Sequence, residues 1–151
     1  MNVCQGLVQA LVAEGTEVVF GLMAEDNIDL LLEMENQPGL KVFMTRHEQG
    51  AVAMADGYAR ITGRPGVCVV GRGPAVAHTG TALVTARKRP SPVIMLVPFF
   101  SINELHSNKY FEQEMYLRST VGNVVTIRNP KTLEQDIHRA FRHAQVTGVP
   151  V

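Results

Sequence analysis

The sequence has no tryptophan, and it has only two cysteines among its 151 residues. Two cysteines are too few for a disulfide framework, and Cys4 and Cys68 lack the spacing of zinc ligands, so we interpret them as buried, reduced thiols of a cytoplasmic protein. Charge of one sign is not in excess, because 14 Lys and Arg balance 14 Asp and Glu. This balance argues against a nucleic-acid partner or an anionic membrane surface.

Long hydrophobic runs are also missing. No stretch is long enough to cross a bilayer, and the first fifteen residues lack the basic start and the long apolar core of a signal peptide. The hydrophobic fraction of 46% and the charged fraction of 19% are ordinary for a globular protein. With this length, we expect one domain over residues 1–151, built around a single core.

Short apolar runs alternate with helical patterns along the chain. Strands are predicted at 17–21, 41–45, 67–71, 91–98 and 123–127, with a further strand beginning in 148–151. Helices are predicted at 3–15, 25–35, 48–62 and 75–88, and after a cap at Asn129 and Pro130, while 101–119 reads as a loop and a short helix. This alternation predicts an α/β fold of three layers, α/β/α, with a six-stranded, mostly parallel sheet.

Open parallel sheets bind ligands beyond the carboxyl ends of their strands. Three loops of this sequence occupy such positions, at residues 21–26, 45–50 and 71–75. The loop 71–75, "GRGPA", precedes a predicted helix, so its backbone N–H groups could meet an anion or a ring. It contains neither a "GxGxxG" motif nor a Walker-type lysine, and a plain tight turn is the alternative interpretation.

Glu48 is the main candidate for a functional side chain. On a helix it shares one side with Ala51, Val52, Ala55 and Ala59, whose small size lets another backbone come close. One interpretation is a carboxylate held beside a tight interface, where a ligand nitrogen could meet it. The other is a tightly packed helix whose first acidic residue only complements the helix dipole.

The histidines do not form a predicted metal site. His47 precedes Glu48 but would point elsewhere on a helix, and His138 and His143 are five residues apart, which does not place them on one helical face. The order of residues along the chain also supports no Ser–His–Asp or Cys–His arrangement. We therefore predict no metal ligands in this chain.

The segment 46–70, "RHEQGAVAMADGYARITGRPGVCVV", resembles the N-terminal, pyrimidine-binding domain of thiamine diphosphate enzymes. The resemblance is strongest to the group of acetolactate synthase, benzoylformate decarboxylase and pyruvate oxidase. The segments "VAEGTEVVFG" (12–21) and "IHRAFRHAQVTGVPV" (137–151) fit the same pattern, so it spans nearly the whole chain.

The resemblance implies a role for Glu48. It matches the glutamate that hydrogen-bonds the pyrimidine ring nitrogen of thiamine diphosphate, so that the coenzyme's own exocyclic nitrogen can remove the C2 proton and give the ylide. The implied activity is decarboxylation or carboligation of a 2-oxo acid. Cofactor-binding positions implied beside Glu48 are Gly21, Leu22, Gly73, Pro74 and His78. For the family glutamine, either Gln113 or no residue is the equivalent.

The chain also departs from the family pattern. Gly71 and Arg72 stand where the family often has Thr-Ser, and His78 stands in place of an Asn. No "GDG" motif occurs, so the resemblance implies that Mg²⁺ and the diphosphate are held by a diphosphate-binding domain, in a longer chain or in a partner subunit. It also implies a last strand that runs past Val151, and a homodimer or heteromer in which the Glu48 helix lies at the contact.

Two alternatives differ in class from an active enzyme. One is a separately encoded or degenerate subunit with a binding or regulatory role and no catalysis of its own. The other is a doubly wound nucleotide-binding domain that carries the Glu48 segment by chance, and the missing phosphate-binding fingerprint weighs against it.

Overall fold

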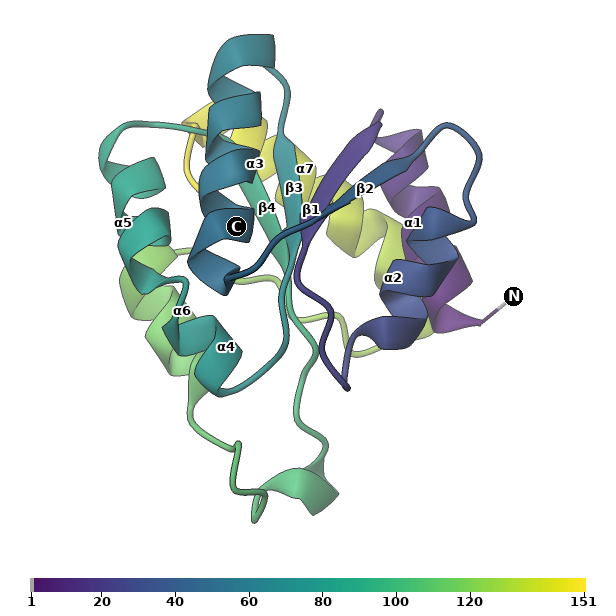
Figure 1. Ribbon diagram of the computed structural model, residues 1–151, viewed down its shortest axis with the longest axis vertical. Coiled ribbons are helices and arrows are strands. Elements are labelled where there is room, and N and C mark those ends of the chain that lie inside the picture. Colours follow the sequence, from purple (N-terminus) through teal and green to yellow (C-terminus); the bar gives the residue numbers. More distant parts are fainter. Residues whose placement is uncertain (1) are drawn as a thin grey trace.

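Four short runs rich in β-branched residues form one parallel sheet (Figure 1). The computed structural model describes residues 2–151, and its strands are β1 (Val18–Gly21), β2 (Lys41–Met44), β3 (Gly66–Val69) and β4 (Val93–Leu96). Their order in the sheet is β2-β1-β3-β4, and all three pairs are parallel. Every residue of β3 is buried, which explains its uninterrupted apolar sequence.

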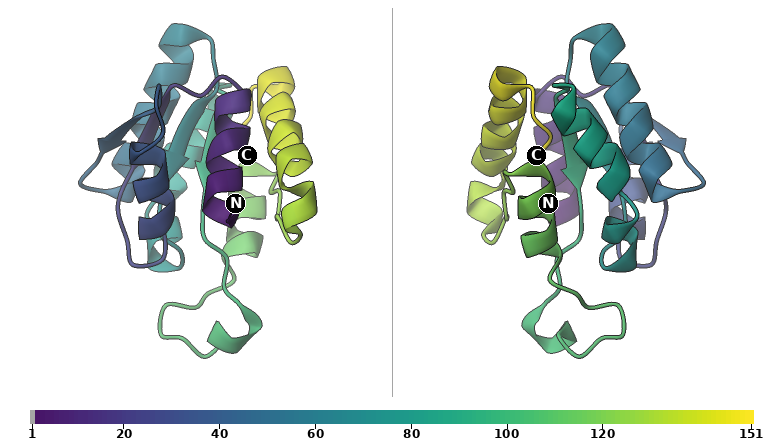
Figure 2. Two further views of the ribbon diagram at one scale, coloured as in Figure 1. Left: turned by 90° about the vertical axis from the view of Figure 1, so that its right-hand side faces the viewer. Right: turned by 90° about the vertical axis from the view of Figure 1, so that its left-hand side faces the viewer.

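Helices cover both faces of the sheet (Figure 2). One face carries α1 (Val3–Ala13), α2 (Ile28–Glu35) and α7 (Leu133–Thr147), and the other carries α3 (Glu48–Thr62), α5 (Gly80–Lys88) and α6 (Gln113–Val121). Three single turns complete the chain: α4 (Pro74–Ala77), η1 (Ile102–Glu104) and η2 (Pro130–Thr132). The predicted α/β class and its three layers are confirmed.

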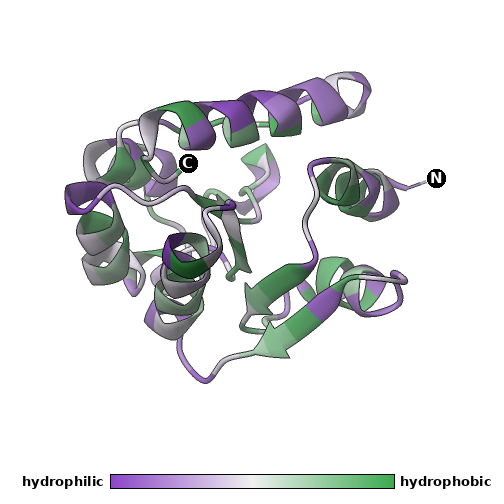
Figure 3. Cartoon of the chain, turned by 90° about the horizontal axis from the view of Figure 1, so that it is seen from above, coloured by the Kyte–Doolittle hydropathy of each residue, from purple (hydrophilic) through white to green (hydrophobic). Residues whose placement is uncertain are grey.

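Each helix turns its hydrophobic side to the sheet. In Figure 3 the strands are largely green, whereas α7 shows its polar residues on the outside. The side of α7 that is buried carries Leu133, Ile137, Ala140, Phe141 and Ala144, at the spacing of an amphipathic helix. None of the helices over residues 2–151 is long and apolar enough to span a membrane.

The alanine face of α3 packs against the sheet of its own chain. Ala51 and Ala55 are fully buried, and a Cβ at Gly66 of β3 would collide with the Ala55 carbonyl. This close approach of helix and strand explains why the face is built from small residues. The sheet of the same chain occupies this face, and the contact of the Glu48 helix with another subunit stays a prediction.

The predicted number of strands is wrong, because the described sheet has four strands and not six. Residues 123–127 have no strand assignment. A strand requires a hydrogen-bonded neighbour, and none of the backbone hydrogen bonds found among residues 2–151 involves this segment. Val151 does pair with β4, since its N–H donates to the Val93 carbonyl and its carbonyl accepts from the Met95 N–H, each at 2.9 Å.

An apolar groove of about 430 Å³ separates β4 from the segment 123–127. Ile94 and Leu96 line it on the strand side, and Val125 and Ile127 line it on the other. The hydrophobic residues of 123–127 therefore pack against the core without joining the sheet, and Val151 is the residue that bonds to β4.

The helix predicted over 75–88 is interrupted. It divides into α4 and α5, with His78 and Thr79 between them. The Tyr116 hydroxyl donates a hydrogen bond to the Ala77 carbonyl at 3.1 Å, and a Cβ at Gly80 would collide with that hydroxyl. The side chain of α6 thus occupies the bend, which leaves His78 exposed at the end of α4.

Candidate functional site

The three loops selected from the sequence meet at the carboxyl edge of the sheet. The Thr45 N–H donates to the Gly21 carbonyl at 2.7 Å, and the Leu22 N–H donates to the Val69 carbonyl at 3.1 Å, so the ends of β1, β2 and β3 are tied together. In the sheet, β2 and β3 lie on opposite sides of β1, so the chain reverses its direction across the sheet between β2 and β3. This reversal of strand order is the switch point where ligands of open α/β sheets bind.

His47 is the cap of α3 and not part of the helix. Its backbone is extended, with φ −158° and ψ 144°, and its Nδ1 accepts a hydrogen bond from the Gln49 N–H at 3.1 Å. The Thr45 hydroxyl lies 3.2 Å from the His47 carbonyl and holds the residue before the helix. The prediction that His47 points away from Glu48 assumed a helical backbone and is wrong: its Nδ1 lies 3.9 Å from Glu48 Oε2.

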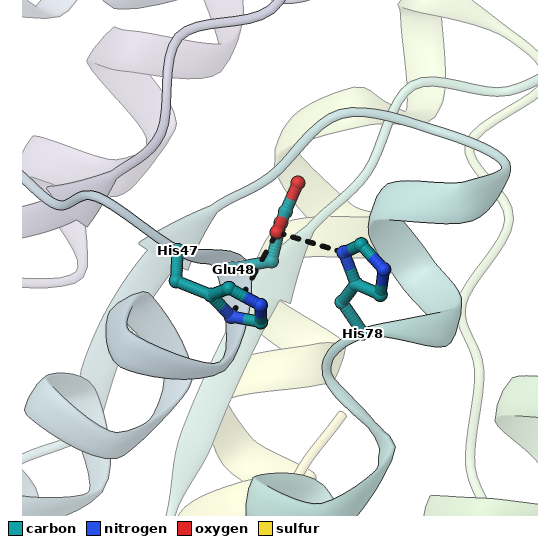
Figure 4. A group of neighbouring side chains, drawn as sticks. All are labelled: His47, Glu48 and His78. Carbon is teal, nitrogen blue, oxygen red and sulfur yellow. Dashed lines mark hydrogen bonds and ion pairs between the residues drawn. The ribbon is translucent and has the colours of Figure 1, made fainter.

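Glu48 begins α3, and its carboxylate contacts His78 (Figure 4). The distance from His78 Nδ1 to Glu48 Oε2 is 3.1 Å. His78 reaches the carboxylate because the bend after α4 places it beside the start of α3, although 30 residues separate the two in sequence. The family resemblance implied both residues as cofactor-binding positions, and the fold brings them together.

The Glu48 carboxylate is mostly shielded but not fully engaged. Its side chain is only 16% exposed, whereas both histidine side chains are 56% exposed. Both contacts involve Oε2, and Oε1 accepts no hydrogen bond from the residues that the structure describes. The first turn of α3 adds the positive end of a helix dipole. A shielded acceptor oxygen at a sheet edge can bind a ligand N–H group.

Gly73 and Gln113 shape the third loop. Gly73 has φ +66°, and a Cβ there would collide with the Lys109 carbonyl, so the tight turn requires glycine. The Gln113 side-chain oxygen accepts from the Gly73 N–H at 3.0 Å, and its nitrogen donates to the Pro98 carbonyl at 2.8 Å. Gln113 is 5% exposed. Both ends of the Gln113 amide are hydrogen-bonded within the protein, and these two bonds hold the loop at Gly73 against the segment 98–113.

Arg72 fastens the same loop to the η1 segment. Its guanidinium pairs with Glu104 through contacts of 2.5 and 2.8 Å and with Asp26 at 3.2 Å, and it lies 4.6 Å from the centre of the Phe100 ring. Hydrogen bonds from Arg72 and then from Ser101 lower the pKa of Glu104 to about 2, and the bond to Glu104 raises the pKa of Arg72. The arginine thus bridges two carboxylates and connects the loop to the η1 segment.

The remaining predicted positions lie around this edge without contacting Glu48. Gly21 is buried, and a Cβ on it would come within 2.9 Å of Leu31 Cδ2. Leu22 is half-buried, and Pro74 is exposed as the first residue of α4. Sequence reasoning missed His47 as a neighbour of Glu48 and Arg72 as a clamp. A signal for the former was available, since a residue that caps a helix is not itself helical.

The chain belongs to the family described as thiamine pyrophosphate enzymes, N-terminal thiamine pyrophosphate binding domain, whose model matches residues 1–120. The parallel sheet, its two helical layers and the loop carrying Glu48 all lie within or beside the matched segment. The resemblance of residues 46–70 to pyrimidine-binding domains is confirmed by this match. Thiamine diphosphate is the coenzyme that the family implies.

Several curated proteins are similar to the chain. A probable 2-ketoarginine decarboxylase of Pseudomonas aeruginosa is 40% identical over 92 residues, which cover 61% of this chain and 16% of that protein. The acetolactate synthase large subunit of Haemophilus influenzae is 32% identical over 146 residues, which cover 95% of this chain and 25% of that protein. A sulfoacetaldehyde acetyltransferase of Castellaniella defragrans is 35% identical over 98 residues, which cover 65% of this chain and 16% of that protein. The matches thus span about a quarter or less of each relative.

Proposed function

We propose that this chain supplies the pyrimidine-binding half of a thiamine diphosphate-dependent enzyme that decarboxylates or joins 2-oxo acids, with Glu48 as the group that activates the coenzyme. The supporting observation is the carboxylate itself, which is 16% exposed at the carboxyl edge of the sheet and has one oxygen without a partner among the described residues. The substrate class is supported by the names of the relatives, which include a decarboxylase and acetolactate synthases.

The residues of this chain fit the pyrimidine side of the coenzyme. Bound thiamine diphosphate supplies the carbanion chemistry, and the protein supplies its orientation and a proton partner. Glu48 would share a proton with the pyrimidine ring nitrogen, and this would favour the coenzyme tautomer that acts as a base. The packing of α3 on β3 fixes the height of this carboxylate above the sheet, and the turn at Gly73 and the side chain of Leu22 border the same edge.

A diphosphate-binding domain completes the site in this proposal, in a longer chain or as a partner subunit. The relatives are about four or more times as long as their matched segments, so they have room for such a domain. Mg²⁺ and the diphosphate are assigned to that domain. The residues of this chain are then responsible for the pyrimidine end alone.

The test is deuterium exchange at C2 of bound thiamine diphosphate, with the diphosphate-binding domain present. Glu48→Gln keeps the size of the side chain and a hydrogen bond but cannot exchange a proton, so we expect exchange to slow by at least about a hundredfold. Glu14→Gln is the matched control, because Glu14 also pairs with a histidine, His138, at 2.7 Å and is 19% exposed. Coenzyme affinity is measured for each variant.

Equal exchange rates for the wild type and Glu48→Gln, at equal coenzyme occupancy, would contradict the proposal. Glu48 would then be a helix-start acid that complements the dipole of α3. A chain that binds its partner domain normally but supports no exchange even as wild type would instead favour the binding or regulatory subunit named among the alternatives.

A further inference from the structure

Two imidazole rings converge on the Glu48 carboxylate from different segments of the chain. His47 comes from the cap of α3, and His78 comes from the bend after α4 (Figure 4). The rings stack with their centres 5.1 Å apart and their planes at 27°. One ligand atom from each of the three residues lies within 4.8 Å of the other two.

Two histidines and one carboxylate are a donor set that binds transition metals. Zn–N and Zn–O bonds of roughly 2.0–2.2 Å place neighbouring ligand atoms about 3.4 Å apart in a tetrahedral site. The distances to Glu48 Oε2 are 3.1 Å from His78 Nδ1 and 3.9 Å from His47 Nδ1, which bracket that value. Small rotations of two half-exposed side chains are enough to bring all three donors to one ion.

We infer that His47, Glu48 and His78 form a binding site for a divalent transition metal such as Zn²⁺ or Co²⁺. The inference extends to competition: an ion bound at Oε2 keeps the Glu48 carboxylate deprotonated, whereas the proposed function requires the same carboxylate to share a proton with the coenzyme pyrimidine, so the two exclude each other. The site itself depends only on the geometry of the three side chains, whereas the competition rests on the function proposed above.

The donor types select the class of ion. Imidazole nitrogens suit zinc, cobalt, nickel and copper, while Mg²⁺ prefers oxygen donors and retains its waters. Three protein ligands leave a fourth tetrahedral position open to water, as in exposed zinc sites. To bind through Nδ1, His47 gives up the hydrogen bond that it accepts from the Gln49 N–H, and the ion takes that lone pair.

The chain contains a natural comparison for this cluster. His138 Nδ1 lies 2.7 Å from Glu14 Oε1, so a histidine and a carboxylate also meet between α1 and α7. That pair lacks a third ligand, since the cluster of His47, Glu48 and His78 is the only group of three or more potential metal ligands found within residues 2–151. A simple His–Glu ion pair and a three-ligand site can therefore be distinguished within one protein.

The experiment is a titration of the tag-free full chain with Co²⁺, followed by its visible ligand-field absorption, and with Zn²⁺ by calorimetry. Three forms are compared: the wild type, His78→Asn and His138→Asn. We expect one tight site in the wild type, at least about a tenfold weaker affinity in His78→Asn, and no change in His138→Asn. Excess Mg²⁺ should not displace Co²⁺. Thermal unfolding confirms that each variant is folded.

Two results would overturn the metal site: wild-type affinity no greater than that of His78→Asn, or equal weakening by His138→Asn. Competition is measured separately, as coenzyme affinity with the diphosphate-binding domain present, with and without Zn²⁺. A lower apparent affinity with Zn²⁺ in the wild type, but not in His78→Asn, supports mutual exclusion. Metal binding that leaves coenzyme affinity unchanged refutes the competition, and the metal site then stands independently of the proposed function.

Discussion

The Gln113 side chain offers a quantitative test of how the third loop is held. Its amide satisfies two backbone groups that are far apart in sequence, the Gly73 N–H and the Pro98 carbonyl. Gln113→Ala removes both partners at once. A buried backbone group left without a partner costs about 1–3 kcal/mol, and the Pro98 carbonyl is only partly buried, so we expect a loss of about 3 kcal/mol in the free energy of unfolding.

For a domain of this size, a loss of about 3 kcal/mol lowers Tm by about 6–12 °C. The assay is chemical and thermal unfolding of Gln113→Ala against the wild type. Gln9→Ala is the matched control, because Gln9 is exposed and bonds only the Gln37 side chain, so its effect should stay within about 0.5 kcal/mol. The two variants remove the same chemical group from a buried and from an exposed position.

Gln113→Glu adds a dependence on pH. A carboxylate still accepts from the Gly73 N–H but cannot donate to the Pro98 carbonyl, so burial and this lost donor raise the pKa of the new carboxyl above its unfolded value. The protonated form stabilises the fold below the unfolded pKa, and this stability is lost as pH rises through the folded pKa. If Gln113→Ala and Gln113→Glu both unfold like the wild type at every pH, the amide does not hold the loop and our reasoning is refuted.

Two further predictions concern charge and thiol chemistry. Glu104→Gln should weaken the fold at pH 7, and because hydrogen bonds from Arg72 and Ser101 lower the pKa of Glu104 from 4.5 to about 2, the difference from the wild type should shrink as pH falls through that window. Urea unfolding at each pH measures it, and a difference as large at pH 2 as at pH 7 would contradict the ion pair. Burial raises the pKa of the Cys68 thiol, and burial together with the charges of Asp29 and Glu33 raises the pKa of the Cys4 thiol. Thiol reagents should therefore label Cys4 slowly and Cys68 only on unfolding, and rapid labelling of Cys68 in the native protein would show that the β3 face opens.

Local patterns in the sequence determined the class of the fold. The apolar run predicted at 67–71 overlaps β3, whose residues are all buried, and amphipathic spacing in 133–147 marks a helix with one buried side. The position of Glu48 at the start of a helix after a strand made it a candidate, and the resemblance of 46–70 to pyrimidine-binding domains supplied its expected role. These features depend on residues close together in the chain, so a single sequence is enough to predict them.

Long-range contacts decided what the sequence could not. Residues 123–127 have strand-like composition, yet a strand exists only where a hydrogen-bonded neighbour lies beside it, and the position next to β4 is taken by Val151 alone. The break between α4 and α5 likewise depends on Tyr116, which lies 39 residues beyond Ala77. Neither partner can be predicted from the segment that it alters.

The site shows the same division. The sequence identified Glu48 and His78 separately, but their contact depends on the bend after α4, and the approach of His47 depends on an extended backbone at the helix cap. The small residues of α3 were correctly expected to admit a neighbouring backbone, but the neighbour is β3 of the same chain. Helix periodicity shows which residues share a face, whereas tertiary packing determines what that face contacts.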